Sequence, residues 1–170
     1  SHMIQTTDGN LHVSGMEGEI NAFSASGNIA AKNNKGELNL KTISGNISAN
    51  SAEGEIRIRA VSGNIDVSEL KGTLIAATTS GDISAGILTP GEGTYAETVS
   101  GKVMLSIPNK FGYSIQATGM SVDLSRILEN ASYEGSVRPR DASVIIGEGQ
   151  IPVRLSSVSG EIVIIPTFNR

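Results

Sequence analysis

The chain has 170 residues and a mass of 17.6 kDa, enough for one domain with a sizeable core and too few for two of ordinary size. It contains 20 glycines but only three Tyr, three Phe and no Trp, so we expect a core of small and branched aliphatic side chains. The net charge of −4 gives no electrostatic reason to expect nucleic acid or anionic lipid as a partner. The lack of cysteine excludes disulfides, thiolate metal sites and thiol catalysis.

The beginning of the chain is interpreted in two parts. Ser1–Met3 resemble the remnant of a cleaved expression tag, and residues 4–170 are predicted to form one domain. No apolar run reaches the roughly 18 to 20 residues of a membrane span, and no signal-peptide pattern follows the tag residues. We therefore expect no direct membrane insertion within this sequence, and we expect any anchor to lie in a segment outside it.

Glycine recurs every nine residues through the first half of the chain. The positions are 9, 18, 27, 36, 45, 54, 63, 72 and 81. Residues two and four after each glycine are mostly aliphatic, as Leu11 and Val13 are, while the residues between them are mostly polar. This period of two predicts a short strand with one buried face, and the glycine predicts a corner after it.

Two kinds of nonamer alternate, so the repeat is 18 residues long. One kind reads Ser-Gly-Asn-Ile and the other Gly-Glu-aliphatic. A fold built of hairpins does not require residues 18 positions apart to be chemically similar. Stacked coils do, because they place those residues in direct contact about 4.8 Å apart. The sequence therefore predicts an all-β fold, a right-handed parallel β-helix (β-solenoid) with about 18 residues per coil.

Stacking would align chemically matching residues in columns. Two aliphatic columns would face each other across a thin interior with no room for large rings: Ile20, Leu38, Ile56 and Leu74 in one, and Leu11, Ile29, Ile47, Ile65 and Ile83 in the other. Three polar columns are predicted. The first is an amide ladder of Asn10, Asn28, Asn46, Asn64 and Asp82, and the second alternates in charge through Glu17, Lys35, Glu53 and Lys71. The third is acidic and must be screened by solvent, and it contains Glu19, Glu37 and Glu55.

The repeat loosens after Gly81. Pro90–Gly93 inserts two residues, so regular coils are predicted over about 9–107, and irregular coils with capping over about 108–170. Within the irregular part, 113–117 and 121–124 alternate like strands, and 124–130 could form one short helical turn. The repeat motif returns at 157–162.

The Ser-Gly-[Asn/Asp]-Ile motifs that begin at residues 26, 44, 62 and 80, together with the closing segment 147–162, resemble the bacterial family of adhesin-like β-strand-repeat domains of unknown function. The resemblance covers nearly the whole chain, although 108–150 departs from the simple repeat. It implies a β-helical domain at the cell envelope or outside the cell, carried beside a membrane anchor in proteins with surface or envelope-stress roles. It brings no catalytic residues to this chain.

The residues that could serve an enzyme or a metal site are also explained by the repeat itself. Glycan-processing β-helices need converging carboxylates, for which the candidates are Glu37, Glu55 and Asp66, with Arg57 nearby. A repeat places exposed polar residues there in any case, and His12 has no second histidine beside it. Calcium-binding nonapeptide repeats carry a Gly-Gly-x-Gly-x-Asp pattern that this chain lacks. We predict no catalytic residues, no metal ligands and no cofactor.

Pairs of hydroxyl residues precede several corner glycines: Ser24/Ser26, Thr42/Ser44, Thr78/Ser80 and Thr98/Ser100, interrupted at Ala60. Hydroxyl ladders can bind ice or glycans, but a hydroxyl next to a corner glycine suits turn capping better. We expect a non-enzymatic envelope or surface domain that acts as a scaffold or interaction module, with a protein or a glycan as partner. The alternative is a carbohydrate-active enzyme or glycan-binding module on an exposed face, and neither the binding residues nor the oligomeric state follow from the sequence.

Overall fold

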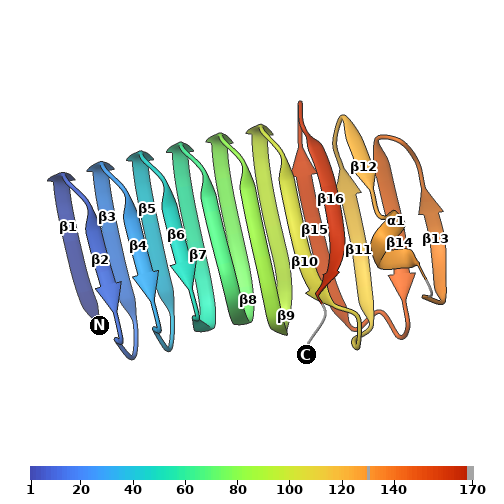
Figure 1. Cartoon of the computed structure of the whole chain (residues 1–170), viewed down its shortest axis with the longest axis horizontal. Helices are drawn as coiled ribbons and strands as arrows, with labels where there is room; N and C mark the ends of the chain where they lie inside the picture. Colours follow the sequence, from blue (N-terminus) through green and yellow to red (C-terminus); the bar gives the residue numbers. More distant parts are fainter. Residues whose placement is uncertain (130, 168–170) are drawn as a thin grey trace.

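A computed structural model describes residues 1–129 and 131–167 of the chain. Figure 1 shows coils stacked side by side along the long axis, from β1 at one end to β13 and β14 at the other. Within the described residues, sixteen strands form one hydrogen-bonded sheet that bends around the corners. No helix in the described part of the chain is long and apolar enough to cross a membrane.

The bent sheet has two faces, named here the front sheet and the back sheet. The front sheet follows the order β1-β3-β5-β7-β8-β9-β15-β11-β14-β13, and the back sheet holds β2, β4, β6, the starts of β8 and β9, then β10, β16 and β12. The strands of the regular coils are β1 (His2–Asp8), β2 (Leu11–Ser14), β3 (Ile20–Ser26), β4 (Ile29–Lys32), β5 (Leu38–Ser44), β6 (Ile47–Asn50), β7 (Glu53–Ser62), β8 (Ile65–Ser80), β9 (Ile83–Ser100) and β10 (Val103–Pro108).

The predicted 18-residue register is confirmed. Neighbouring strands of the regular coils are parallel, and Ile29 pairs with Ile47, which pairs with Ile65. All three side chains are 1% exposed, so the aliphatic columns form the core as the alternation predicted. At the two-residue insertion the register between β8 and β9 changes, from Gly72 opposite Pro90 to Leu74 opposite Thr94.

The corner glycines fix how closely the coils approach. Gly63 has φ +148°, and a Cβ placed on it would lie 1.9 Å from the carbonyl oxygen of Gly45. The same clash with the preceding coil recurs at Gly27, Gly45 and Gly81. A side chain at these corners would therefore force the coils apart as well as strain the backbone.

The stacking extends beyond the glycine repeat at the N-terminal end. His2 and Met3, interpreted as tag residues, belong to β1 and pair with Ile20 and Asn21 of β3. The first strand therefore begins before residue 9, where the sequence places the first regular coil. An extended backbone with one neighbouring strand can accept these residues because their side chains lie on the exposed surface.

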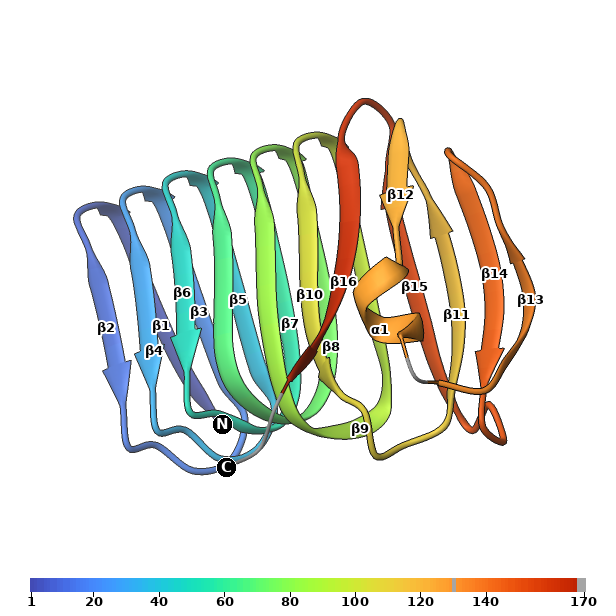
Figure 2. The same ribbon diagram turned by 45° about the vertical axis from the view of Figure 1, so that its right-hand side comes forward.

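The coils near the C-terminal end do not stack in sequence order. β15 (Ile151–Ser157) and β16 (Glu161–Thr167) pair with β9 and β10 on one side, and with β11 (Tyr113–Thr118) and β12 (Ser121–Asp123) on the other. Figure 2 shows the two red strands between the yellow and orange ones. Sequence order predicts 151–167 as part of the outer cap, whereas the structure inserts it as a regular coil. Its Ser-Gly-Glu-Ile motif explains this, because Gly160 continues the glycine column against Gly101.

The segment between β12 and β15 closes this end of the rod. It contains α1 (Ser125–Leu128), β13 (Tyr133–Val137) and β14 (Asp141–Ile146), which pairs antiparallel with β11. The predicted helical turn is confirmed over 125–128, while Asn130 lies outside the described residues. Hydrogen bonds from the hydroxyl and backbone N–H of Ser125 lower the pKa of Asp123 and order the entry to the helix.

The expectation that the interior has no room for large rings is wrong at this end. Tyr113 on β11 is 1% exposed, and its hydroxyl donates a hydrogen bond of 2.7 Å to the carbonyl oxygen of Pro108. Burial raises the pKa of the Tyr113 phenol. The ring has room because the short back-sheet strand β12 is followed here by α1, in place of the rest of a regular coil (Figure 2).

The corner geometry predicts a large difference between two Gly→Ala substitutions. Gly63→Ala is expected to lower the free energy of unfolding by about 2–5 kcal/mol, because it adds backbone strain and a clash with Gly45. Gly86→Ala is the matched control, since its Cβ would find its nearest neighbour at 3.8 Å. Urea unfolding followed by circular dichroism measures both, and equal losses would contradict the role given to the corner.

Candidate functional site

The amide ladder exists, but with a different partner from the one expected. The backbone N–H of Asn28, Asn46 and Asn64 each donates to the side-chain oxygen of the equivalent asparagine one coil earlier, at 3.0, 2.8 and 2.9 Å. The sequence predicted bonds between side chains. Because only an acceptor oxygen is needed, Asp82 can occupy the same column, and it accepts from the N–H of Lys102.

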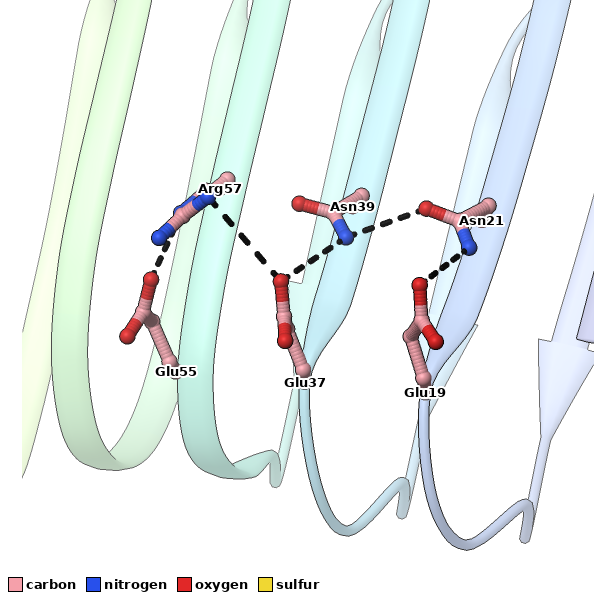
Figure 3. A network of polar contacts seen from close by, with 6 residues as sticks. All are labelled: Glu19, Asn21, Glu37, Asn39, Glu55 and Arg57. Atoms are coloured by element: carbon pink, nitrogen blue, oxygen red, sulfur yellow. Dashed lines mark hydrogen bonds and ion pairs between the residues drawn. The ribbon is translucent and has the colours of Figure 1, made fainter. Parts of the chain in front are cut away.

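The acidic column is compensated by the residue two positions further along each strand. Nδ2 of Asn21 donates to Glu19 at 3.0 Å, Nδ2 of Asn39 to Glu37 at 3.2 Å, and Nε of Arg57 to Glu55 at 2.6 Å. Figure 3 shows the three pairs in line, with Arg57 also 4.0 Å from Glu37 and Asn39 donating to Asn21. Solvent screening alone was expected for this column, and the structure adds a donor for every carboxylate.

The column of alternating charge is aligned as predicted. Glu17, Lys35, Glu53 and Lys71 follow one another in adjacent coils. Nζ of Lys35 lies 3.8 Å from a carboxylate oxygen of Glu53, with both side chains more than half exposed. An exposed pair of this kind adds little stability, so the column guides register more than it strengthens the fold.

The hydroxyl pairs do not form an exposed hydroxyl face. The first member of each pair is buried, and its hydroxyl donates to the carbonyl oxygen of a corner glycine one coil earlier, as in Thr42 to Gly27 at 3.3 Å and Thr78 to Gly63 at 3.2 Å. Ser157 makes the same bond to Gly101 at 2.8 Å, which is a further reason why the C-terminal coil stacks there. These contacts agree with turn capping and leave one exposed hydroxyl in each pair.

The residues considered for an enzyme separate onto two faces. Glu37, Glu55 and Arg57 lie together on the front side of the rod, where they bind one another (Figure 3). Asp66 and His12 lie exposed on strands of the back sheet. Within 1–129 and 131–167, no three His, Asp or Glu side chains are placed to hold a metal ion.

A hollow lies on the outer face of the front sheet, and we call it the front hollow. Its volume is about 620 Å³, and five neighbouring strands, β7, β8, β9, β15 and β11, contribute to it. The outward side chains form two rows across these strands: Arg57, Ile75, Tyr95, Arg154 and Gln116 in one, and Arg59, Ala77, Glu97, Ser156 and Thr118 in the other. The short side chain of Ala77 between the longer Arg59 and Glu97 makes the floor low.

Two of the three guanidinium groups that line the front hollow have no acidic partner. Of the residues lining it, Arg57 is paired with Glu37 and Glu55. Arg59 and Arg154 are exposed, and no carboxylate of the described residues lies within 4.0 Å of either. Beside them the ring of Tyr95 is half-buried, so it offers a fixed aromatic edge next to two available cations.

Sequence reasoning missed the front hollow. Arg57 was considered only as a partner for carboxylates, and the two-residue spacing of Arg57 and Arg59 was the signal for an outward basic row. Arg154 comes from the inserted C-terminal coil, so its place two strands from Ile75 could not be found from the repeat.

The fold and its surface define a β-solenoid domain of stacked 18-residue coils with a cationic hollow on the outer face of its front sheet. The chain belongs to the Toastrack family, a domain of unknown function (DUF4097), whose model matches residues 4–165. No curated protein and no solved structure is similar enough to count as a match.

Substitutions in the asparagine column can distinguish the contribution of the acceptor oxygen to stability from that of the rest of the side chain. Asn46→Asp retains an oxygen for the N–H of Asn64 and is expected to change the unfolding free energy by less than about 0.5 kcal/mol. Asn46→Ala removes the acceptor and is expected to cost about 1 kcal/mol. Urea unfolding of both variants decides, and a loss from Asn46→Asp as large as that from Asn46→Ala would show that the amide group itself matters.

The interrupted hydroxyl column predicts a stabilising substitution. Ala60 lies between Thr42 and Thr78 in register, so Ala60→Thr is expected to donate to Gly45 and to raise the unfolding free energy by about 0.5–1.5 kcal/mol. Ala60→Val has nearly the same shape without the hydroxyl and is the control. Thermal and urea unfolding compare them, and equal stability of the two variants would contradict the proposed hydrogen bond.

Proposed function

We propose that this domain is a non-enzymatic interaction module of a cell-envelope protein, and that it binds an anionic glycan chain in the front hollow. The observation that carries the proposal is the pair of unpartnered guanidinium groups, Arg59 and Arg154, on either side of Tyr95. The position at the envelope, the adhesin-like role and the anchor outside this sequence rest on the resemblance of the repeat motifs to envelope proteins.

The chemistry of the hollow suits an extended carboxylated glycan. Guanidinium groups bind carboxylates through two parallel hydrogen bonds, and an aromatic ring can pack against the C–H face of a sugar. Arg59 and Arg154 lie on strands separated by β8 and β9, so they would meet successive charged groups of one chain rather than a single small anion. Gln116 and Thr118 add uncharged hydrogen-bonding groups at the far rim.

The rigidity of the rod supports binding. Every lining side chain stands on a strand that is hydrogen-bonded on both sides, from β7 to β11. A surface that is already ordered loses little conformational entropy when a ligand arrives, so modest contacts can still give useful affinity.

A carbohydrate-active enzyme on the same face is the alternative, and the geometry favours it less. Hydrolysis of a glycosidic bond needs two carboxylates flanking that bond. Glu97 is the one carboxylate among the residues that line the front hollow. Glu37 and Glu55 lie outside it and are engaged by Asn39 and Arg57.

Calorimetric titration with an oligogalacturonate tests the proposal, with a neutral maltooligosaccharide of equal length as the reference ligand. We expect binding of the acidic chain only, weaker at high salt, and a loss of affinity of about tenfold or more in Arg59→Ala and Arg154→Ala. Lys32→Ala, which removes an exposed cation from β4 on the back sheet, is the control and should change affinity less than about twofold. Equal binding of the neutral chain, or no binding of the acidic one, would refute the proposal.

A further inference from the structure

The strand at the C-terminal end of the front sheet has an open edge. β13 pairs with β14 on one side, and the front sheet ends there. All five of its residues are exposed, including Tyr133 at 47% and Val137 at 43%. An open edge with apolar side chains is a template for pairing with another strand, and β13 contains no proline or lysine that would oppose this.

The exposed apolar residues lie on the side of β13 that faces the interior elsewhere in the sheet. Tyr133 is in register with Ile146, which is in register with Tyr113 on β11. In this row Tyr113 is 1% exposed, whereas Tyr133 is 47% exposed. The difference arises because Tyr133 lies beyond the elements that cover the inner face of the front sheet. Val137 likewise follows the buried Ala142. The structure therefore leaves an apolar row that continues the core without cover.

We propose that two copies of this chain pair through β13 to form a two-fold symmetric dimer. Antiparallel pairing about Gly135 places Tyr133 of each copy opposite Val137 of the other. Aromatic and β-branched residues opposite each other are a favourable cross-strand pair, and the symmetry makes the contact twice. The front sheets of the two rods become one continuous sheet across the dimer axis.

Charge makes a second copy a better occupant than an arbitrary strand. Glu134 and Arg138 lie four residues apart on the outward side of β13 and the turn that follows it. The same pairing sets Glu134 of each copy diagonally across from Arg138 of the other, within reach of side chains of this length. Neither residue has an ion-pair partner within 4.0 Å in the described part of the chain, and the backbone N–H of Arg138 donates to the backbone carbonyl oxygen of Asp141. The strand is thus complementary to itself in both shape and charge.

The pairing would also leave the front hollow free. The hollow extends from β7 to β11, and β14 separates β13 from β11, the last strand that lines it. A dimer would therefore display two hollows on one continuous sheet, which favours a polymeric ligand by allowing both sites to bind one chain. The inference about the dimer itself is independent of the proposed glycan.

Sedimentation equilibrium of the whole 170-residue chain tests the dimer, at concentrations from about 1 to 100 μM, the range in which modest interfaces of this kind associate. We expect a dimer whose dissociation constant rises about tenfold or more in Glu134→Arg and in Arg138→Glu, because each reversal creates two like-charge contacts. The double reversal should restore the constant to within about threefold of the original, since it regenerates both opposite-charge contacts. Lys32→Glu on the back sheet is the charge-reversal control, and circular dichroism checks that every variant keeps its β structure.

Several results would overturn the inference. A monomer at all concentrations would exclude the dimer, and a dimer unaffected by either reversal would place the interface elsewhere. Failure of the double reversal to restore association would refute the pairing about Gly135. As a further variant, Tyr133→Ser should weaken association without destabilising the fold, because the side chain is already 47% exposed, and unchanged association would contradict the apolar contact.

Discussion

The close approach of backbone to backbone at the corner glycines is the constraint on which the rest of the structure depends. A Cβ on Gly160 would lie 1.6 Å from the carbonyl oxygen of Gly101, and one on Gly81 would lie 2.0 Å from that of Gly63. Only a residue without a side chain permits this contact, so the corners can stack at the spacing of hydrogen-bonded strands. Once the corners are stacked, residues of the regular coils that are 18 positions apart fall into the same column. The chemistry of each column follows from its place in the coil.

The columns give several kinds of polar side chain along the regular coils a repeated hydrogen-bond partner. Asparagine oxygens accept backbone N–H groups, buried hydroxyls donate to glycine carbonyls, and amides or arginine donate to the acidic column. No buried side-chain nitrogen or oxygen among the described residues lacks a hydrogen-bond partner. Against this background, charged groups such as Arg59 and Arg154 that are not used by the fold stand out, which is why the front hollow is the surface where we place binding.

The C-terminal end of the rod is only partly covered. At the C-terminal end, α1 and the hairpin of β13 and β14 cover the last coils and bury Tyr113, Leu124 and Ile127. No second layer covers β13, the last strand of the front sheet, so the apolar row of Tyr133 and Val137 remains exposed. Self-pairing of β13 would complete that row by symmetry, and it would turn a short rod with one front hollow into a longer sheet with two.

The sequence by itself determined the regular part of the fold, because residues such as Ile29, Ile47 and Ile65 repeat at the spacing of direct contacts. It also determined the alternating charges, the insertion at 90–93 and the helical turn after Leu124, since each is a local pattern. Only the tertiary structure decided the order of the last coils, in which 151–167 lies between segments that precede it in sequence. A repeat motif indicates that a segment can stack as a coil, but it does not indicate which coils become its neighbours. For the same reason the front hollow could not be predicted: Arg154 meets Tyr95 through a pairing between strands almost sixty residues apart. The backbone N–H of Asn64 as the donor to Asn46 was likewise decided by the distance between coils, which repeat spacing does not contain.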